Sequence, residues 1–186
     1  MIQHRCRWCN LQNPLYVEYH DREWCVPQYN DAMLFELLLL ESFQAGLSWE
    51  IILNKRENFR CAFDYFDPAL ICSYDDVKIQ LLMENSGIIR NRRKIESIIH
   101  NAGVFLQIQE EWGSFCNYIW HFTVGNVIYE VDRTCSPLSD QIAVDLKMRG
   151  MKFIGSTTVY SYLQAIGIVY SHEQQCYLHH KIQENK

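Results

Sequence analysis

The pattern of apolar and polar positions is helical over most of the chain from residue 31 onwards. The most apolar stretch, residues 32–40, follows Asp31, a residue type that favours the N-cap position of a helix. Helical spacing continues the leucine stripe of this stretch into Glu41, whereas Glu36 lies about 140° away around the helix and is expected to reach solvent. The pattern therefore predicts a core-facing stripe that ends in a carboxylate.

Residues 1–30 differ from the rest of the chain because they are dense in aromatic residues and turn formers. We expect them to form an ordered arm with one short helix, packed on the core. Residues 127–131 have the composition of a short strand inside a looser stretch at 123–138, but one strand does not make a sheet. The sequence predicts a single all-α domain over residues 1–186, with helices at about 31–45, 49–62, 75–86, 91–108, 111–121, 139–149, 156–167 and 171–177.

Composition narrows the class of protein. The 186 residues are 48% hydrophobic and 21% charged, so the chain can bury a substantial core and is not of the disordered class. It contains no apolar stretch long enough to span a bilayer and no signal-peptide core, so we expect a cytoplasmic protein. The net charge of −5 excludes a globally basic surface. Lys and Arg still cluster at residues 55–60, 90–94 and 147–152, which solvated helix faces or local binding patches would both explain.

Eight cysteines in a chain without secretory features are expected to be thiols or metal ligands. Mixed apolar surroundings predict that four of them are small core residues, namely Cys61, Cys72, Cys116 and Cys135.

Cysteine and histidine residues near both ends of the chain are candidate metal ligands. His172 and Cys176 are four residues apart, so on a helix they project from the same face. Near the other end, Cys6 forms a close pair with Cys9 and a wider one with His20. Two such half-sites favour tetrahedral zinc and would tie the chain ends to the core. The alternative interpretation is surface thiols and a helix-end histidine.

The segment 41–49 could combine an acid and a large ring in one cavity. A glutamate on the apolar side of a helix must be paired, protonated or held for chemistry, because burial of an unpaired charge is costly. Gly46 is expected to end the helix, and Trp49 follows closely. The alternative is that Glu41 turns back to water at the helix end.

Residues 145–160 have the pattern of two helices joined by a short loop between Gly150 and Gly155. The glycines allow a tight turn that presents backbone N–H groups, an arrangement that can receive a phosphate. Lys147, Arg149 and Lys152 surround this loop. An ordinary helical hairpin explains the same pattern.

Together these residues resemble the 3-methyladenine DNA glycosylase I family, within the helix-hairpin-helix glycosylase superfamily. The segment 41–49, Glu-x-x-Gln-Ala-Gly-Leu-Ser-Trp, is highly specific for this family. Further matches run almost from end to end: Arg5-Cys6 with Trp8, residues 13–16, Tyr19-His20-Asp21 with Glu23-Trp24, and residues 55–58, 87–95, 149–155 and 172–176.

The resemblance implies a two-lobed, all-α enzyme whose cleft accepts a nucleotide extruded from duplex DNA. Nothing in the sequence indicates an obligate oligomer, so we expect a monomer. The implied reaction is hydrolysis of the N-glycosidic bond of 3-methyladenine in alkylated DNA, which leaves an abasic site. By resemblance, Glu41 and Tyr19 hydrogen-bond the methylated base, Trp49 stacks on it, and Trp8 and Tyr16 line the pocket.

The family's structural zinc clasp maps to four residues and leaves Cys9 outside the site: Cys6, His20, His172 and Cys176. The hairpin from Gly150 through Lys152 to Gly155 corresponds to the superfamily's anchor on the DNA backbone. Gly46 and Leu47 would lie near the gap left by the flipped nucleotide.

Many relatives in the superfamily carry a catalytic aspartate beyond the hairpin glycines, but residues 168–172 here contain none. No lysine is evidently placed for Schiff-base chemistry, so the resemblance implies a monofunctional enzyme that relies on a labile cationic substrate. Two alternatives are a catalytically silent binder of damaged DNA or methylated purines, and a zinc-stabilised interaction module unrelated to DNA.

The sequence departs from the family pattern in several places. Cys25 and Arg93 stand where glycine is common, and neither is expected to touch the pocket. Phe43 replaces an often polar residue and is expected to alter the pocket floor. Residues 123–138 match poorly, so their conformation stays open.

Overall fold

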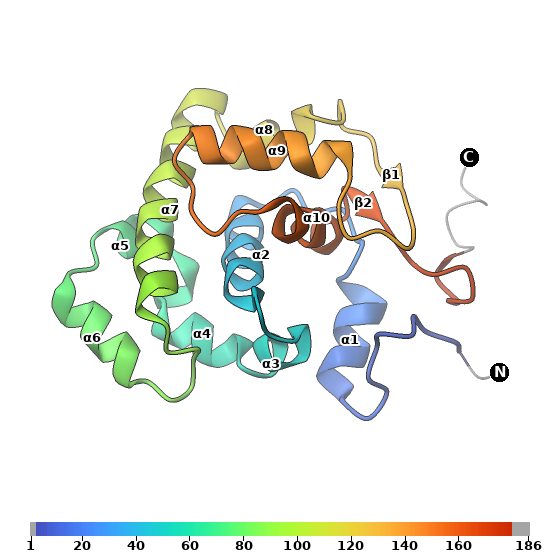
Figure 1. The fold of residues 1–186 in the computed structure, drawn as a ribbon, viewed down its shortest axis with the longest axis horizontal. Coiled ribbons are helices and arrows are strands. Elements are labelled where there is room, and N and C mark those ends of the chain that lie inside the picture. Colours follow the sequence, from blue (N-terminus) through green and yellow to red (C-terminus); the bar gives the residue numbers. More distant parts are fainter. Residues whose placement is uncertain (1–2, 180–186) are drawn as a thin grey trace.

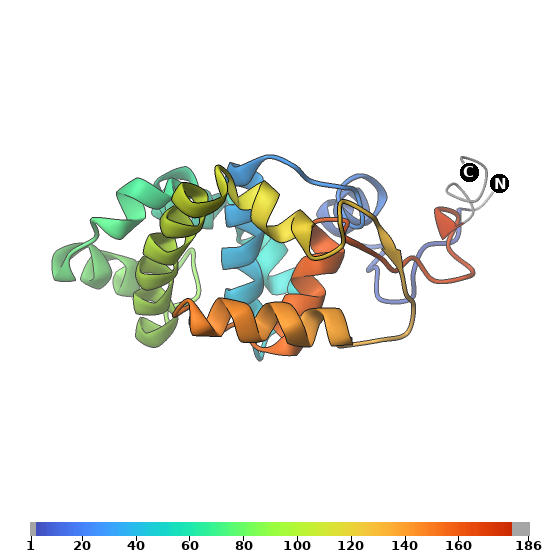
Figure 2. The same cartoon turned by 90° about the horizontal axis from the view of Figure 1, so that it is seen from above.

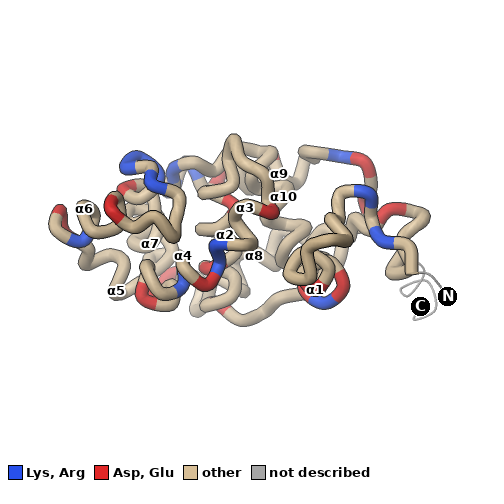
Figure 3. Tube along the Cα trace, turned by 90° about the horizontal axis from the view of Figure 1, so that it is seen from below, with Lys and Arg blue, Asp and Glu red and all other residues tan. Residues whose placement is uncertain are grey.

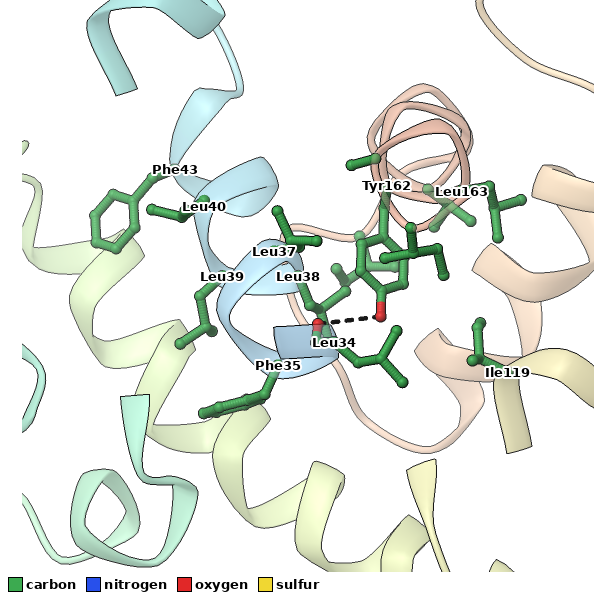
Figure 4. Close-up of a cluster of buried hydrophobic side chains, with 14 of the residues drawn as sticks. Leu34, Phe35, Leu37, Leu38, Leu39, Leu40, Phe43, Ile119, Tyr162 and Leu163 are labelled. Atoms are coloured by element: carbon green, nitrogen blue, oxygen red, sulfur yellow. Dashed lines mark hydrogen bonds between the residues drawn. The ribbon is translucent and has the colours of Figure 1, made fainter. Parts of the chain in front are cut away.

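Helix α2 (Asp31–Gln44) lies at the centre of the molecule, with other helices packed around it (Figure 1). The computed structural model describes residues 3–179. Every residue of α2 from Leu34 to Phe43 is buried, as expected for a helix that is apolar almost all round. Side chains of α2 such as Leu34 and Leu38 meet Tyr162, which donates a hydrogen bond to the Leu34 carbonyl at 3.1 Å (Figure 4).

The described residues are mostly helical. A single parallel ladder pairs Ile128 with Val169 and Tyr129 with Tyr170. The other elements are α1 (Pro14–Arg22), α3 (Trp49–Asn54), α4 (Arg56–Ala62), the 3₁₀ turn η1 (Asp64–Phe66), α5 (Pro68–Cys72), α6 (Asp76–Glu84), α7 (Arg92–Trp112), α8 (Phe115–His121), β1 (Ile128–Tyr129), α9 (Pro137–Met148), α10 (Ser156–Ala165) and β2 (Val169–Tyr170).

The helices are arranged so that distant segments of the chain meet. Helices α5, α6 and α7 gather at one end of the molecule, and α1 lies at the other (Figures 1 and 2). Helix α10 packs on both α9 and α2. Beside α1, the Tyr177 N–H donates to the His4 carbonyl at 2.8 Å, which joins the two ends of the described chain.

The start of α2 corrects one prediction. Its N-cap is Asn30, whose side chain accepts from the Met33 N–H, and not Asp31. The Asp31 carboxylate instead accepts hydrogen bonds from the backbone N–H groups of Phe115 and Cys116, both at 2.8 Å. Asp31 therefore caps the N-terminus of α8, where a negative charge is favourable.

Glu36 does not reach solvent, contrary to prediction. It is buried and forms ion pairs with Arg56 at 2.5 Å and Arg60 at 2.8 Å. Arg56 also pairs with Glu23 at 2.7 Å. Helix α4 therefore covers Glu36, and the guanidinium groups of Arg56 and Arg60 offset the cost of removing its charge from water.

Several element boundaries also differ from prediction. The expected helix 49–62 is divided at Lys55, which serves as C-cap of α3 and N-cap of α4. The η1 turn and α5 were not predicted. Residues 171–177 form turns after β2, so His172 and Cys176 do not lie on a helix.

The cysteines expected in the core are on or near the surface. Cys61, Cys72 and Cys135 are exposed and Cys116 is partly buried, because each lies on an outward face or in a loop. Of the helices within residues 3–179, none has the length and apolar character needed to cross a membrane.

Candidate active site and metal cluster

A pocket of about 340 Å³ opens between α1, α2, α3 and α10. It contains all five residues predicted to surround the base: Trp8, Tyr16, Tyr19, Glu41 and Trp49. Sequence reasoning missed the remaining lining residues, which come from the end of α2, from α10 and from three loops: Trp24, Gln44, Asp132, Arg133, Thr134, Ser161, Gln164, Ser171 and Glu173.

Glu41, in the last turn of α2, is the buried carboxylate of the pocket. Glu41 is only 3% exposed, and its Oε2 atom has no hydrogen-bond partner. Burial raises the pKa of Glu41 to about 8, so the free protein holds this group mostly protonated at neutral pH. Glu41 therefore faces the cavity as an unsatisfied polar group, and the alternative of a solvent-exposed side chain is wrong.

Trp49 and Tyr19 form an aromatic wall beside Glu41. Their ring centroids are 5.2 Å apart at an angle of 45°. Trp49 starts α3 after the N-cap Ser48 and is 8% exposed, and its indole Nε1 has no hydrogen-bond partner. Burial, with a smaller contribution from the charge of Glu41, raises the pKa of Tyr19 well above its usual range, so its hydroxyl stays protonated.

Trp8 connects the pocket to the interior of the arm. Its ring lies 5.3 Å from that of Tyr16, 5.2 Å from that of His20 and 4.7 Å from that of Trp24. The aromatic density of residues 1–30 indicated such a cluster, but it did not indicate that Trp24 also reaches the pocket.

The rim of the pocket includes Asp132, Arg133 and Thr134. They belong to residues 123–138, whose conformation the sequence did not predict. The ladder of β1 with β2 places this segment beside residues 171–173. The Arg7 guanidinium lies 3.6 Å from the carboxylate of Asp132 and 3.3 Å from that of Glu173, two residues of the pocket lining. Glu41 is therefore the buried acid of the pocket, while two further carboxylates lie at its edge.

Phe43 does not form the pocket floor, contrary to prediction. It is fully buried, with its ring 4.6 Å from that of Phe59 and 5.8 Å from that of Phe63. Figure 4 shows it on the side of α2 that faces away from Tyr162. Gln44 from the same turn lines the pocket instead.

A second buried cluster lies behind the aromatic residues of the arm. The ligand atoms of four residues all lie within 4.8 Å of one another: Cys6, His20, His172 and Cys176. His172 Nδ1 is 3.5 Å from both sulfurs, and His20 Nε2 is 3.6 Å from Cys176 Sγ. A tetrahedral zinc ion with usual bond lengths has ligand atoms about 3.3–3.8 Å apart, so these distances fit such an ion.

Neighbouring groups orient His20 within this cluster. His20 Nδ1 donates to Asp21 at 2.8 Å, and Asp21 is held by Arg5 at 2.6 Å. This leaves the Nε2 lone pair directed at the cluster, where it also accepts from the Cys6 N–H at 3.2 Å. Burial lowers the pKa of His172 to about 4, so its imidazole is neutral and suited to bind a metal.

Cys9, the rival ligand, lies outside the cluster. Its thiol faces the Tyr16 carbonyl at 3.8 Å. His172 and Cys176 meet through a turn, in which the Cys176 N–H donates to the Glu173 carbonyl at 2.8 Å, rather than through helical spacing.

The two loops predicted to contact DNA lie outside the pocket lining. Gly46 has a φ of +83° and open space around it, and Leu47 is partly buried. Gly150 has a φ of +100°, whereas Gly155 has the extended conformation of a helix N-cap. Arg149 is engaged by Glu111 and Asp145, which reduces its local positive charge, while Lys152 is exposed. Across the chain, basic residues fall in short separate groups among acidic ones (Figure 3).

The sequence and fold both have clear relatives. Residues 8–180 match the family described as methyladenine glycosylase. The chain is 41% identical to DNA-3-methyladenine glycosylase 1 of Escherichia coli (strain K12), over 92% of this chain and 95% of that protein. It is 39% identical to DNA-3-methyladenine glycosylase of Haemophilus influenzae (strain ATCC 51907 / DSM 11121 / KW20 / Rd), over 92% and 96%.

Solved structures of similar proteins have the same fold. A crystal structure of 3-methyladenine DNA glycosylase I superposes with a TM-score of 0.91 at 42% identity, covering 95% of this chain and all of that one. A structure from Staphylococcus aureus, described as the structural basis of 3-methyladenine recognition, has a TM-score of 0.88 at 35% identity, with 94% and 97% covered.

This helical fold, with relatives at this level of identity over nearly their whole length, defines a hydrolase of the DNA glycosylase class. The chain belongs to the methyladenine glycosylase family, which confirms the resemblance noted in its sequence.

Proposed function

We propose that this protein hydrolyses the N-glycosidic bond of 3-methyladenine in alkylated duplex DNA, releasing the free base and leaving an abasic site. The observation that carries the proposal is the pocket itself: a buried carboxylate, Glu41, and an indole N–H, Trp49, both lack partners beside an aromatic wall. Relatives named for this activity support it.

The chemistry of the lesion fits these groups. 3-Methyladenine in DNA is a flat cation, and its departure as a neutral base is already favoured by that charge. Aromatic faces such as Trp49 attract a cation by about 0.5–2 kcal/mol per contact. A cation in the pocket would lower the pKa of Glu41, so its proton would pass to solvent, and the resulting carboxylate would stabilise the oxocarbenium-like sugar as the C1′–N bond breaks. A water molecule would then form the new C1′–O bond and release a proton to solvent. The hydroxyl of Tyr19, held protonated by burial, can hydrogen-bond the base.

The same proposal accounts for the other predicted contacts. The hairpin between α9 and α10 would bind the DNA backbone through residues 150–155, while Gly46 and Leu47 would lie near the gap left by the extruded nucleotide. Among the described residues that line the pocket there is no lysine, which supports a monofunctional enzyme without lyase activity. We propose that it acts as a cytoplasmic monomer.

The Cys6, His20, His172 and Cys176 cluster is proposed to hold one structural zinc ion. Bound there, zinc would tie the arm to the segment after β2 and would supply no reactive water, because four protein ligands close the coordination sphere. Asp21 keeps His20 in the required orientation.

The direct test is incubation of the purified protein with methylated duplex DNA, followed by identification of the released bases. Release of 3-methyladenine above a heat-inactivated control is the expected result. Binding to an abasic duplex without release would identify a catalytically silent binder instead. Absence of both release and abasic-duplex binding at low salt would contradict a role in DNA repair.

A further inference from the structure

Helix α7 contacts both loops that the proposed function brings against DNA. We call residues 45–48, which follow α2, the wedge loop, and residues 149–155, between α9 and α10, the hairpin loop. In Figures 1 and 2 the connection from α9 to α10 runs beside α7. Residues 87–95, which comprise the loop before α7 and its first turn, are part of the family pattern, yet neither the pocket nor the metal cluster includes them.

Lys94 holds the base of the wedge loop. Its side chain is buried, and Nζ donates to the Phe43 carbonyl at 2.8 Å and to the Ala45 carbonyl at 2.7 Å. These carbonyls lie at the C-terminus of α2, where the helix dipole is negative and backbone acceptors lack helical partners. A buried ammonium group thus fixes the direction in which the chain leaves α2 towards Gly46.

Asn101 holds the hairpin loop in a comparable way. It is fully buried, and its side-chain amide pairs with the backbone of one residue: Nδ2 donates to the Lys152 carbonyl at 2.9 Å, and Oδ1 accepts from the Lys152 N–H at 2.8 Å. Next to it, His100 Nε2 lies 2.8 Å from the Gly150 carbonyl. Lys152, in the middle of the loop, is therefore attached to α7, while the N–H groups of Gly150 and Met151 donate to carbonyls of α9.

The two attachments lie on the same face of one rigid helix. Lys94 and Asn101 are seven residues apart, which corresponds to two helical turns and about 10 Å along the axis. Both side chains are buried polar groups that bind backbone atoms of another segment. Burying a polar group costs desolvation free energy, so its presence in the core suggests that the position of the segment it holds is important.

We propose that Lys94 and Asn101 are positioning residues that set the separation between the wedge loop and the hairpin loop. This inference rests on the proposed function, in which one loop binds the DNA backbone while the other occupies the space of the extruded nucleotide. Both contacts form together only if the loops are correctly spaced, and displacements of about 1 Å can lower an enzymatic rate about 100-fold. The binding of a free base in the pocket does not depend on this spacing.

The experiment compares DNA-dependent and DNA-independent functions in four variants. Lys94→Met removes the donor at similar length, and Lys94→Arg keeps donors that can reach carbonyls. Asn101→Leu removes both hydrogen bonds at similar volume, and exposed His100→Ala removes one hydrogen bond without disturbing the core. Gln107→Met, exposed on the same helix, is the control. Each protein is tested below its unfolding temperature for affinity towards free 3-methyladenine by tryptophan fluorescence, affinity towards a duplex with a stable abasic-site analogue, and single-turnover base release.

For Lys94→Met and Asn101→Leu we expect abasic-duplex affinity and base release to fall by about tenfold or more, with free-base affinity within about twofold of the native value. His100→Ala should show a smaller loss, and Lys94→Arg and Gln107→Met should match the native protein. Equal losses in free-base and duplex binding, or native DNA binding in both variants, would overturn the positioning role. If the native protein itself neither binds the duplex nor releases the base, the proposed function fails and this inference fails with it.

Discussion

The pocket and the Cys/His cluster both take residues from the short helix α1, but they differ in whether their buried polar atoms have polar neighbours. Tyr19 and His20 are consecutive residues of α1, and the first lines the pocket while the second joins the cluster. In the cluster, all four ligand atoms lie within 4.8 Å of one another, three of the pairs are 3.5–3.6 Å apart, and His20 is oriented by Asp21. In the pocket, Glu41 Oε2 and Trp49 Nε1 have no partner.

The difference separates a structural role from a binding role. Buried polar groups that satisfy one another, or that converge at the spacing of a small ion, stabilise the fold. Buried polar groups without partners destabilise the free protein and are retained where a ligand completes them. The comparison therefore predicts that changes in the cluster reduce stability and that changes in the pocket reduce activity.

The largest effect is expected from removal of the proposed zinc ion. Metal analysis should find one zinc per chain, and Cys6→Ser should lose it while Cys9→Ser, outside the cluster, retains it. If free metal exceeds its dissociation constant about 1,000-fold, its loss lowers the free energy of unfolding by about 4 kcal/mol. Zinc retained in Cys6→Ser but lost in Cys9→Ser would reassign the ligand, and protein without zinc would remove the cluster's proposed role.

The next largest loss of stability is expected from a substitution at Gly167. This residue follows α10 and packs on the N-terminal arm, which contributes to both the pocket and the Cys/His cluster. A Cβ atom at Gly167 would lie 2.4 Å from the Pro27 backbone nitrogen, and φ is +73°. Gly167→Ala should therefore lower the free energy of unfolding by about 3 kcal/mol, from strain and overlap together. Gly125→Ala is the matched control, with φ of +75° and open space, and should cost about 1 kcal/mol in denaturant unfolding. Equal costs would show that the arm is not closely packed there.

The pH dependence should distinguish the pocket from the cluster. Because burial raises the pKa of Glu41 to about 8, the ionised form that would stabilise a cation is scarce in the free protein below that pH. We expect kcat/KM to rise by up to about tenfold per pH unit between pH 6 and 8 and then level off. The rise should be absent from Glu41→Gln. A profile of the same shape in this variant would assign the titration to another group.

The smallest effect is expected from the aromatic wall. Trp49→Phe keeps a ring face and removes the unpaired indole N–H, whereas Trp49→Leu removes the ring. We expect the Leu variant to bind free 3-methyladenine about tenfold more weakly, with a smaller loss for Phe, because a ring face stacks on the flat base. Calorimetric titration measures both. Equal losses would indicate that the N–H, rather than the ring, recognises the base.

The helical period was enough to predict most helices, and residue types near both chain ends marked the candidate metal ligands. The choice of Cys6 over Cys9, and of a pocket-facing over a solvent-facing Glu41, came from the family resemblance. Helices were predictable because their period is a local property of the sequence. The sequence could not predict the burial of Glu36, because the two arginines that neutralise it come from a later helix. Asp31 was misassigned for the same reason, since it caps α8 rather than its own helix. Such tertiary partners leave no periodic signal.

The pocket rim was the least predictable part of the site. Asp132 and Arg133 lie in a segment without helical period, and a two-residue ladder places them beside the residues that follow β2. The family resemblance was weak in the same segment. His172 and Cys176 were correctly paired for the wrong reason, because a turn rather than a helix brings them together.

The central claim is that Glu41 is kept buried and unpartnered for a cationic base at the expense of stability. In the folded protein its pKa is about 8 against an ordinary value of 4.5, so the unfolded chain releases this proton first. The stability associated with Glu41 is therefore complete below pH about 4.5 and is lost as the pH rises towards 8.

The most direct test measures denaturant unfolding and single-turnover release of 3-methyladenine for native protein and Glu41→Gln at pH 7.5. We expect Glu41→Gln to be more stable by about 1–3 kcal/mol, with the difference shrinking towards pH 5, and to release the base about 100-fold more slowly. A variant that is less stable than the native protein, or that releases 3-methyladenine at the native rate, would contradict the account.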